Sequence, residues 1–275
     1  MFDTHAHLQF GAFEKNTDEV IAAAKRAGVT HMMIPSTDVA TSQASMRLAQ
    51  KYENIYAAVG IHPHHIFEYQ TQNGKGDIKD ELEEIEKLLS GKKVVAVGEV
   101  GVDRYYYTRT KYADYQVTSE FIDLQKEMLK RQISLALSYN KRLILHNRQA
   151  KADLLDVLDS VWDSKLENRT VLHCCEPDLE LLDYAKSHKM YIGVDGDITY
   201  DSSKADFISR VPLSMLVLET DSPYLLPEPL RTQKKFPNTP ANLKLIAQKV
   251  AEVQQISIDE VKRIITNNAV ALFLE

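Results

Sequence analysis

The sequence has few cysteines, no long hydrophobic run and no excess of basic residues. Its two cysteines, Cys174 and Cys175, are adjacent, which excludes an ordinary disulfide framework and leads us to expect a cytoplasmic location. The chain has no apolar run of roughly 18 residues, so we expect no membrane-spanning helix and no membrane partner. It begins with acid and histidine instead of the basic and apolar regions of a signal peptide, which also favours the cytoplasm.

The charge balance limits the kinds of partner. The formal net charge is −6, from 33 basic and 39 acidic residues, which argues against a general nucleic-acid coat protein. An enzyme that acts on nucleic acid remains possible, because bound metal ions can supply positive charge locally. Nothing in the sequence indicates an obligate protein partner.

Short apolar runs alternate with amphipathic stretches along the whole chain. The runs predict eight buried strands, at residues 1–7, 30–35, 55–60, 94–99, 143–146, 170–173, 190–194 and 216–220. The amphipathic stretches predict helices at 18–27, 42–51, 78–89, 119–139, 151–162, 178–188 and 205–210, with two more within 241–273. Eight strands that alternate with helices predict an α/β fold, a TIM (β/α)₈ barrel, and we expect one domain over residues 1–275.

The opening segment contains His5 and His7 with one residue between them. Residues i and i+2 of a strand point to the same face, so both imidazoles would project together. Such a pair can hold a divalent metal, although a single buried histidine is more often a hydrogen-bonded core residue.

Further histidines and carboxylates follow other predicted strands. Glu99, His146, His173 and Asp221 stand at strand ends, and His62 comes shortly after the strand at 55–60. The active sites of such barrels lie at the carboxyl ends of the strands, where these residues would meet. The sequence therefore predicts a metal site at that end of the barrel.

Imidazole and carboxylate ligands together suit Zn²⁺ or Mn²⁺ better than ions that prefer only oxygen ligands. Mg²⁺ is a further candidate. Four histidines and two carboxylates exceed what one tetrahedral ion needs, so we expect two ions with Glu99 between them. His5, His7 and Asp221 would complete one ion, and His146 and His173 the other. Two neighbouring ions can activate a water and neutralise the oxygens of a displacement, and Asp221 could accept the proton of that water.

Six segments resemble those of TatD-type metal-dependent deoxyribonucleases. They are Asp3-Thr4-His5-Ala6-His7, Val59-Gly60-Ile61-His62-Pro63-His64, Val97-Gly98-Glu99-Val100-Gly101-Val102-Asp103, Leu145-His146-Asn147-Arg148, Val171-Leu172-His173-Cys174 and Leu218-Glu219-Thr220-Asp221-Ser222-Pro223-Tyr224-Leu225. The resemblance implies an amidohydrolase-like TIM barrel, a divalent-metal centre and hydrolysis of DNA phosphodiesters, in the manner of a 3'-5' exonuclease. It also implies that His5, His7, Glu99, His146, His173 and Asp221 are ligands. His62 would contact the phosphate or the leaving group.

Several residues near these motifs are candidates for binding the substrate, single-stranded DNA or a frayed end. The segment 104–115 mixes five tyrosines, Tyr105 among them, with basic residues, which could stack bases and counter phosphate charge. The alternative is that the tyrosines only pack on the barrel rim. His64, Arg148 and Arg231 are further candidates, each with an alternative as an ordinary loop or ion-pairing residue.

Two other functions stay open at this point. The same site could hydrolyse another ester or an amide, such as a lactone, a cyclic amide or an aminoacyl-tRNA ester. The barrel could also be a non-catalytic, metal-stabilised binding protein. The basic and tyrosine-rich loops favour a polyanionic substrate, and the two carboxylates favour an enzyme.

Overall fold

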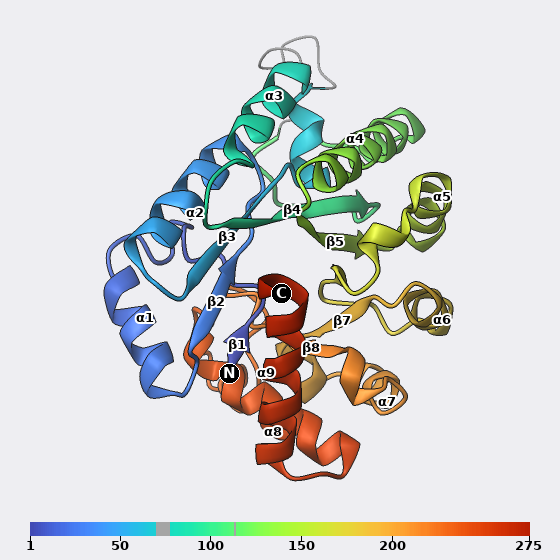
Figure 1. The fold of residues 1–275 in the computed structure, drawn as a ribbon. Helices are drawn as coiled ribbons and strands as arrows, with labels where there is room; N and C mark the ends of the chain where they lie inside the picture. Colours follow the sequence, from blue (N-terminus) through green and yellow to red (C-terminus); the bar gives the residue numbers. More distant parts are fainter. Residues whose placement is uncertain (70–77, 113) are drawn as a thin grey trace.

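The computed structural model describes residues 1–69, 78–112 and 114–275. Within these residues eight parallel strands follow one another in chain order around a barrel, with the helices outside (Figure 1). The strands are β1 (Phe2–Asp3), β2 (His31–Ile34), β3 (Ile55–Val59), β4 (Val94–Asp103), β5 (Arg142–Arg148), β6 (Thr170–Leu172), β7 (Tyr191–Val194) and β8 (Leu216–Leu218). The predicted TIM barrel is confirmed.

The helices lie close to their predicted positions. They are α1 (Thr17–Arg26), α2 (Val39–Lys51), α3 (Ile78–Leu88), α4 (Ser119–Ser138), α5 (Lys151–Val161), α6 (Leu179–Ser187), α7 (Ser202–Ile208), α8 (Leu243–Gln254) and α9 (Ile258–Leu274). In the described ranges, none of the helices is both long and apolar enough to cross a membrane.

Strands β4 and β1 differ most from their predicted ranges. Strand β4 continues to Asp103 because Gly101 lets its backbone approach β5; a Cβ at Gly101 would lie 1.9 Å from the carbonyl oxygen of His146. Strand β1 ends at Asp3, so His5 and His7 lie in the extended segment after it.

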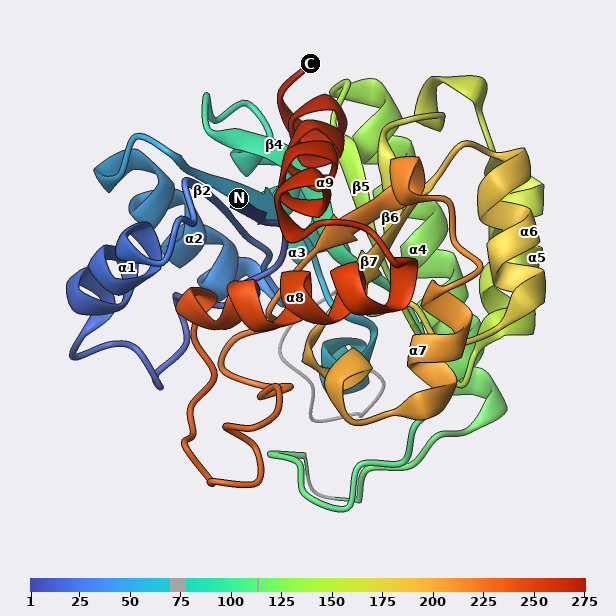
Figure 2. The same cartoon turned by 90° about the horizontal axis from the view of Figure 1, so that it is seen from below.

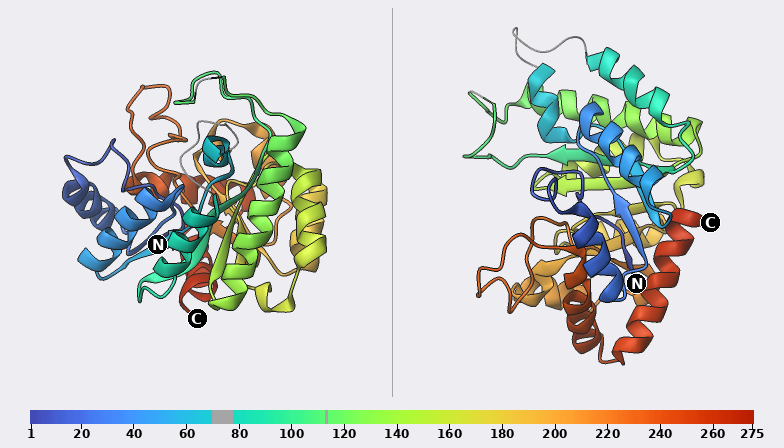
Figure 3. Two further views of the ribbon diagram at one scale, coloured as in Figure 1. Left: turned by 90° about the horizontal axis from the view of Figure 1, so that it is seen from above. Right: turned by 90° about the vertical axis from the view of Figure 1, so that its left-hand side faces the viewer.

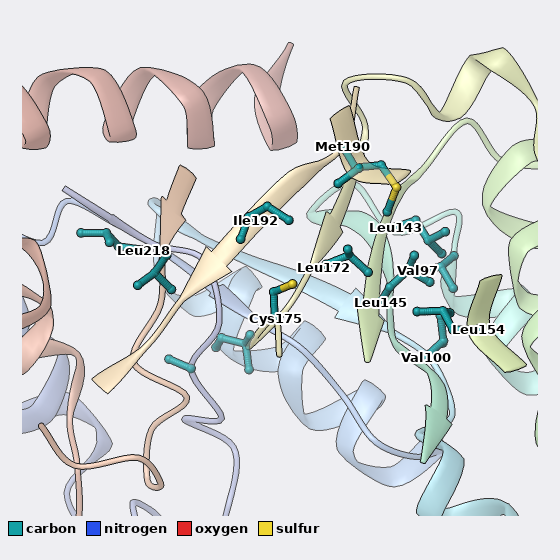
Figure 4. Packing of buried hydrophobic residues seen from close by; sticks show 14 of the residues in the cluster. Val97, Val100, Leu143, Leu145, Leu154, Leu172, Cys175, Met190, Ile192 and Leu218 are labelled. Carbon is teal, nitrogen blue, oxygen red and sulfur yellow. The ribbon is translucent and has the colours of Figure 1, made fainter. Parts of the chain in front are cut away.

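Buried aliphatic side chains fill the space between the barrel and its helices. Figure 4 shows part of this cluster, in which Val100 of β4, Leu145 of β5 and Leu154 of α5 take part. A second cluster closes the amino-terminal end of the barrel, where the rings of Phe2 and Phe273 lie 5.9 Å apart. Helix α9 thus covers that end, which leaves the opposite end for the functional loops.

Those loops project away from α9. Figures 2 and 3 show the segments after β4 and after β8 extending on the side opposite the chain's carboxyl terminus. They border the end of the barrel at which the strands finish, where a TIM barrel carries its active site.

Strands β1 and β8 are joined by scattered hydrogen bonds rather than by a regular ladder. The Thr4 amide donates to the Leu218 carbonyl (3.0 Å), and the Asp221 amide donates to the His5 carbonyl (2.9 Å). The buried carboxylate of Asp3 accepts from the amide of His5 and from both the amide and the hydroxyl of Thr220. Asp3 therefore holds the two segments that carry His5 and Asp221 against each other.

We predict that Asp3→Ala lowers the free energy of unfolding by about 2–4 kcal/mol. The substitution leaves the buried amides of His5 and Thr220 without an acceptor, and each such group costs about 1–3 kcal/mol. Urea denaturation of the metal-free protein measures the change. Asp183→Ala, at an exposed aspartate of α6, is the control and should change stability by less than about 0.5 kcal/mol. Equal stability of the two variants would contradict this role for Asp3.

Candidate metal centre

Five imidazoles surround the buried carboxylate of Glu99 at the carboxyl end of the barrel. They come from the ends of β1, β3, β5 and β6, and each has a ring nitrogen within 3.8 Å of a Glu99 oxygen: His5, His7, His62, His146 and His173. Glu99 is only 4 % exposed. The structure therefore brings together residues that are far apart in the sequence, as the strand-end pattern predicts.

One oxygen of Glu99 faces the histidines after β1. Its Oε2 lies 3.3 Å from Nε2 of His5 and 3.8 Å from Nε2 of His7. Asp221 Oδ1 completes this group, at 3.3 Å from Nε2 of His7 and 3.8 Å from Nε2 of His5. Asp221 has the left-handed backbone angle φ 48°, which aspartate tolerates better than most residues. This backbone turn follows β8 directly and sets the direction of the carboxylate.

The other oxygen of Glu99 faces the remaining three imidazoles. Its Oε1 lies 2.7 Å from Nδ1 of His146 and 3.6 Å from Nε2 of both His62 and His173. Glu99 thus stands between two groups of nitrogen and oxygen donors, one at each of its oxygens.

Hydrogen bonds at the far ring nitrogens determine which nitrogen can bind a metal. His7 Nδ1 lies 3.3 Å from the Pro35 carbonyl, and His173 Nδ1 lies 2.9 Å from Glu219, so in each neutral ring Nδ1 carries the proton and Nε2 is the nitrogen that can bind a metal. His62 is the reverse, because its Nδ1 accepts from the His64 amide (3.1 Å). Neutral His62 therefore carries its proton on Nε2 and is a hydrogen-bond donor there.

Two buried carboxylates that we did not predict as site residues support the histidines. Asp103 Oδ2 lies 3.1 Å from Nε2 of His146, and Glu219 holds Nδ1 of His173 and accepts from the Cys174 amide (2.5 Å). A sequence signal for Asp103 exists, since it follows Glu99 by four residues on one strand and so faces the same side. Glu219 has a sequence signal as well, since it directly follows the end of β8, the kind of position at which the other site residues are predicted.

The buried charges shift the pKa values of the site in opposite directions. Burial and the nearby charge of His173 lower the pKa of His5 to about 3, so His5 is neutral. Burial opposes protonation of His146, but hydrogen bonds to Asp103 and Glu99 outweigh it and raise the pKa to about 9. In the same way, Glu219 and Glu99 outweigh burial at His173 and raise its pKa to about 10. Without a metal, His146 and His173 are therefore protonated at neutral pH.

The predicted substrate-binding residues have different surroundings. Arg148 lies over the ring of Tyr105, with its guanidinium carbon 3.9 Å from the ring centroid, and donates to the hydroxyl of Tyr107 (3.1 Å). Tyr107 in turn donates to Asp103 (2.8 Å), which contacts His146. Arg148 and Tyr107 are therefore connected to His146 through Asp103. His64 is not in the group around Glu99; its Nε2 lies 3.0 Å from the Thr110 hydroxyl.

Arg231 is not brought to the histidines. It pairs with Glu228 at 3.6 Å and lies over the ring of Tyr200 at 4.2 Å. Across the described ranges, no hydrogen bond or ion pair joins it to the group around Glu99. Its role in substrate binding stays a prediction, and Arg231 would act outside the group around Glu99.

The tyrosines of residues 104–115 are largely committed to contacts within the protein. Besides Tyr105 and Tyr107, the hydroxyl of Tyr112 lies 2.9 Å from His65 Nδ1, and Tyr115 is buried. Only Tyr106 is widely exposed among these five, at 57 %. Packing on the barrel rim therefore accounts for four of the five tyrosines. Ala113 of this segment is outside the described residues.

A second cluster lies at the ends of β6 and β7. Cys174, Asp195 and Asp197 could together offer ligand atoms to a cation. The buried ammonium of Lys204 already lies 3.2 Å from Asp197 and 3.7 Å from Asp195. Lys204 supplies the positive charge that these aspartates need, so the cluster does not require a metal ion.

The chain is similar to known proteins over nearly its whole length. The residues 2–274 match the family described as TatD related DNase. A 3'-5' ssDNA/RNA exonuclease TatD of Edwardsiella piscicida is 32 % identical, over 99 % of both chains. An uncharacterized metal-dependent hydrolase of Bacillus subtilis, YabD, is 30 % identical, over 99 % of this chain and 98 % of that protein.

Solved structures agree with these relatives. The crystal structure of YJJV, a TatD homolog of Escherichia coli K12, has a TM-score of 0.82 and 28 % identity, and the match covers 99 % of this chain and 97 % of that one. A TatD-family hydrolase of Entamoeba histolytica, at 21 % identity and a TM-score of 0.80 over 100 % and 98 % of the two chains, shares the fold. Fold and relatives together define a metal-dependent hydrolase built on a TIM barrel. The chain belongs to the TatD-related DNase family.

We predict that metal binding at pH 7 releases about two protons, one each from His146 and His173, because a metal competes with the proton for imidazole nitrogen. Apparent metal affinity should accordingly strengthen as the pH rises from 7 toward 9. Calorimetric titration of metal-free protein with Zn²⁺ in buffers of different ionisation enthalpy counts the protons. Asp103→Asn removes the charge that raises the pKa of His146 and should reduce the release toward one. A binding heat that does not depend on the buffer would contradict the prediction.

We also predict that Gly193→Ala weakens metal affinity by about 10–100-fold, the usual effect of disturbing groups that orient ligands. A Cβ at Gly193 would lie 2.4 Å from the Glu219 carboxylate that holds His173. Gly11→Ala is the matched control, because a Cβ there meets nothing within 4 Å. Competition with a chromophoric chelator measures both variants. Unchanged affinity in Gly193→Ala would show that Glu219 does not position His173 for metal.

Proposed function

We propose that the protein hydrolyses phosphodiester bonds of single-stranded DNA from the 3' end, with two divalent ions held in the candidate metal centre. The observation that carries this proposal is the position of Glu99, whose two oxygens each face a separate group of donors. His5, His7 and Asp221 would hold one ion, and His146 and His173 the other, with Glu99 shared between them.

The donor set suits Zn²⁺ or Mn²⁺, and it could also accept Mg²⁺. The fit is supported by the far-side contacts of His7 and His173, which direct their Nε2 atoms to the centre, and by Nε2 of His5, which lies 3.3 Å from Glu99 and 3.8 Å from Asp221. Two ions in such a centre supply positive charge that polarises the phosphodiester and makes a water molecule more acidic.

The protein's own residues would handle the proton and the phosphate. Asp221 is 14 % exposed at its side chain and is the carboxylate of the centre most open to an attacking water, so it would accept the proton of that water. His62 would donate its Nε2 proton in a hydrogen bond to a phosphate oxygen or to the leaving group. Burial and the charge of His146 lower the pKa of His62 well below its ordinary value, which favours this neutral, donating form.

The choice of nucleic acid is supported by the family and by relatives that are named 3'-5' ssDNA/RNA exonuclease. Membership of a hydrolase family also favours an enzyme over a metal-stabilised binding protein. The same centre could serve a lactone, a cyclic amide or an aminoacyl-tRNA ester, since fold alone does not determine the substrate.

We expect metal-stripped protein to degrade end-labelled single-stranded DNA only after Mg²⁺, Mn²⁺ or Zn²⁺ is restored. A 5' label should give a ladder and a 3' label should be released at once as a short product. Glu99→Gln should reduce the rate by more than about 100-fold, because even residues that only orient metal ligands cost 10–100-fold. Gel analysis of timed samples gives both the rate and the polarity.

Glu19→Gln, at an exposed glutamate of α1, is the matched control and should be as active as the unmodified protein. Full activity of Glu99→Gln would overturn the assigned centre. Absence of cleavage with all three metals, in protein that binds two ions, would move the substrate to another ester or an amide.

A further inference from the structure

Two aromatic rings border the metal centre on the side of His7 and Asp221. The ring of Phe10 lies flat against the imidazole of His7, with centroids 4.5 Å apart and planes 6° apart. The ring of Tyr224 meets Phe10 and His7 edge-on, at 6.4 Å from each. The three rings thus form a continuous aromatic surface that begins at a proposed metal ligand.

Tyr224 is held at this place by the backbone. Its amide donates to the Asp221 carbonyl at 2.8 Å, in the turn that follows β8. The turn that directs Asp221 into the centre therefore also fixes the position of Tyr224 next to it. Burial raises the pKa of the Tyr224 hydroxyl, and the charges of Asp221 and Glu99 raise it further, which agrees with this short distance from the centre.

The exposure of Tyr224 distinguishes it from the tyrosines after β4. Tyr224 is 53 % exposed, and in the part of the chain that the structure describes no group hydrogen-bonds to its hydroxyl. Tyr107 and Tyr112, in contrast, use their hydroxyls to hold Asp103 and His65. Internal packing accounts for those two rings, but it leaves one face of Tyr224 open to a ligand.

A nucleobase fits an open aromatic ring at this position. Unpaired bases stack on tyrosine and phenylalanine whatever their sequence, because every base has a π-face. A base in a duplex is already stacked and paired, so it would have to leave the helix before it could use the ring. A ring next to the reacting phosphate would therefore favour a single strand over a duplex.

We propose that Phe10 and Tyr224 form a stacking platform for the base of a nucleotide that flanks the scissile phosphate. This inference rests on the proposed nuclease function and names the part of the substrate that the site recognises. The platform makes cleavage depend on an unstacked base next to the phosphate, without selecting one of the four bases.

The experiment removes the ring from the protein and the base from the substrate, separately and together. The variants are Tyr224→Ala and Tyr224→Phe, with Tyr139→Ala as the control at a partly exposed tyrosine at the end of α4. The substrates are a single-stranded oligonucleotide and the same strand with abasic residues at its last positions.

Loss of a stacked base predicts a decrease in kcat/KM of about 5- to 100-fold for Tyr224→Ala on the intact strand. The unmodified protein should lose a similar factor on the abasic strand, and Tyr224→Ala should lose little more there, because ring and base act as a pair. Tyr139→Ala should resemble the unmodified protein on both strands, and Tyr224→Phe, which keeps the ring, should lose far less than Tyr224→Ala. Equal losses for Tyr224→Ala on both strands, or a loss in Tyr224→Phe as large as in Tyr224→Ala, would overturn the platform.

A binding measurement separates failure of the platform from failure of the nuclease proposal. A phosphorothioate strand that carries 2-aminopurine near its end resists cleavage, and its fluorescence falls when the base stacks. The metal-loaded protein should quench this fluorescence, and Tyr224→Ala should quench it less. Quenching that is weaker in Tyr224→Ala, without cleavage of the ordinary strand, would contradict the nuclease proposal but support stacking on Tyr224. Cleavage with equal quenching by both proteins, or no quenching by either, would contradict the platform.

Discussion

The buried carboxylate of Glu99 needs partners that replace its lost hydration, and residues from several strands of the barrel supply them. An ionised group that is only 4 % exposed is stable only if opposite charges or hydrogen-bond donors replace the water that it has lost. No single strand can supply all of these partners, because only every second side chain of a strand points to a given face and these lie in one row. The imidazoles therefore come from the ends of several strands. Burial opposes ionisation of Glu99, but the surrounding imidazoles, with a hydrogen bond from His146 among them, outweigh it and lower the pKa of Glu99.

A further layer of contacts then determines what each imidazole can do. Asp103 and Glu219 make two of the histidines strong bases, whereas the His64 amide makes His62 a donor. Tyr107 and Arg148 extend this set of contacts outward from Asp103. Tyr107, in the loop after β4, therefore supports the position of His146. One chemical type of side chain thus serves two roles, and the partner on the far nitrogen decides between them.

Much of this arrangement could be predicted from the sequence. The features that could not be predicted share one cause, which is that they depend on non-local contacts. The strands and the residues at their ends follow from local patterns, so the barrel and the group around Glu99 were accessible. Glu219 stands at a strand end like the predicted residues, but its pairing with His173 depends on a neighbouring strand and on the space left by Gly193, neither of which a local pattern shows. The place of Arg231 outside the group around Glu99 follows from its contacts with Glu228 and Tyr200, which the sequence does not show.

The two sides of the centre differ in what they leave free for a substrate. On the side of His146, polar and aromatic groups are bonded to one another through Asp103, so a ligand there would have to displace existing contacts. On the side of His7, Phe10 and Tyr224 are held by stacking and by one backbone turn, and an aromatic face stays open. A bonded network suits the proposed metal ligands, whose geometry must be kept, while an open ring suits the proposed stacking of a base of any kind. The asymmetry follows from the loops: the segment after β4 supports the centre, and those after β1 and β8 border its entrance.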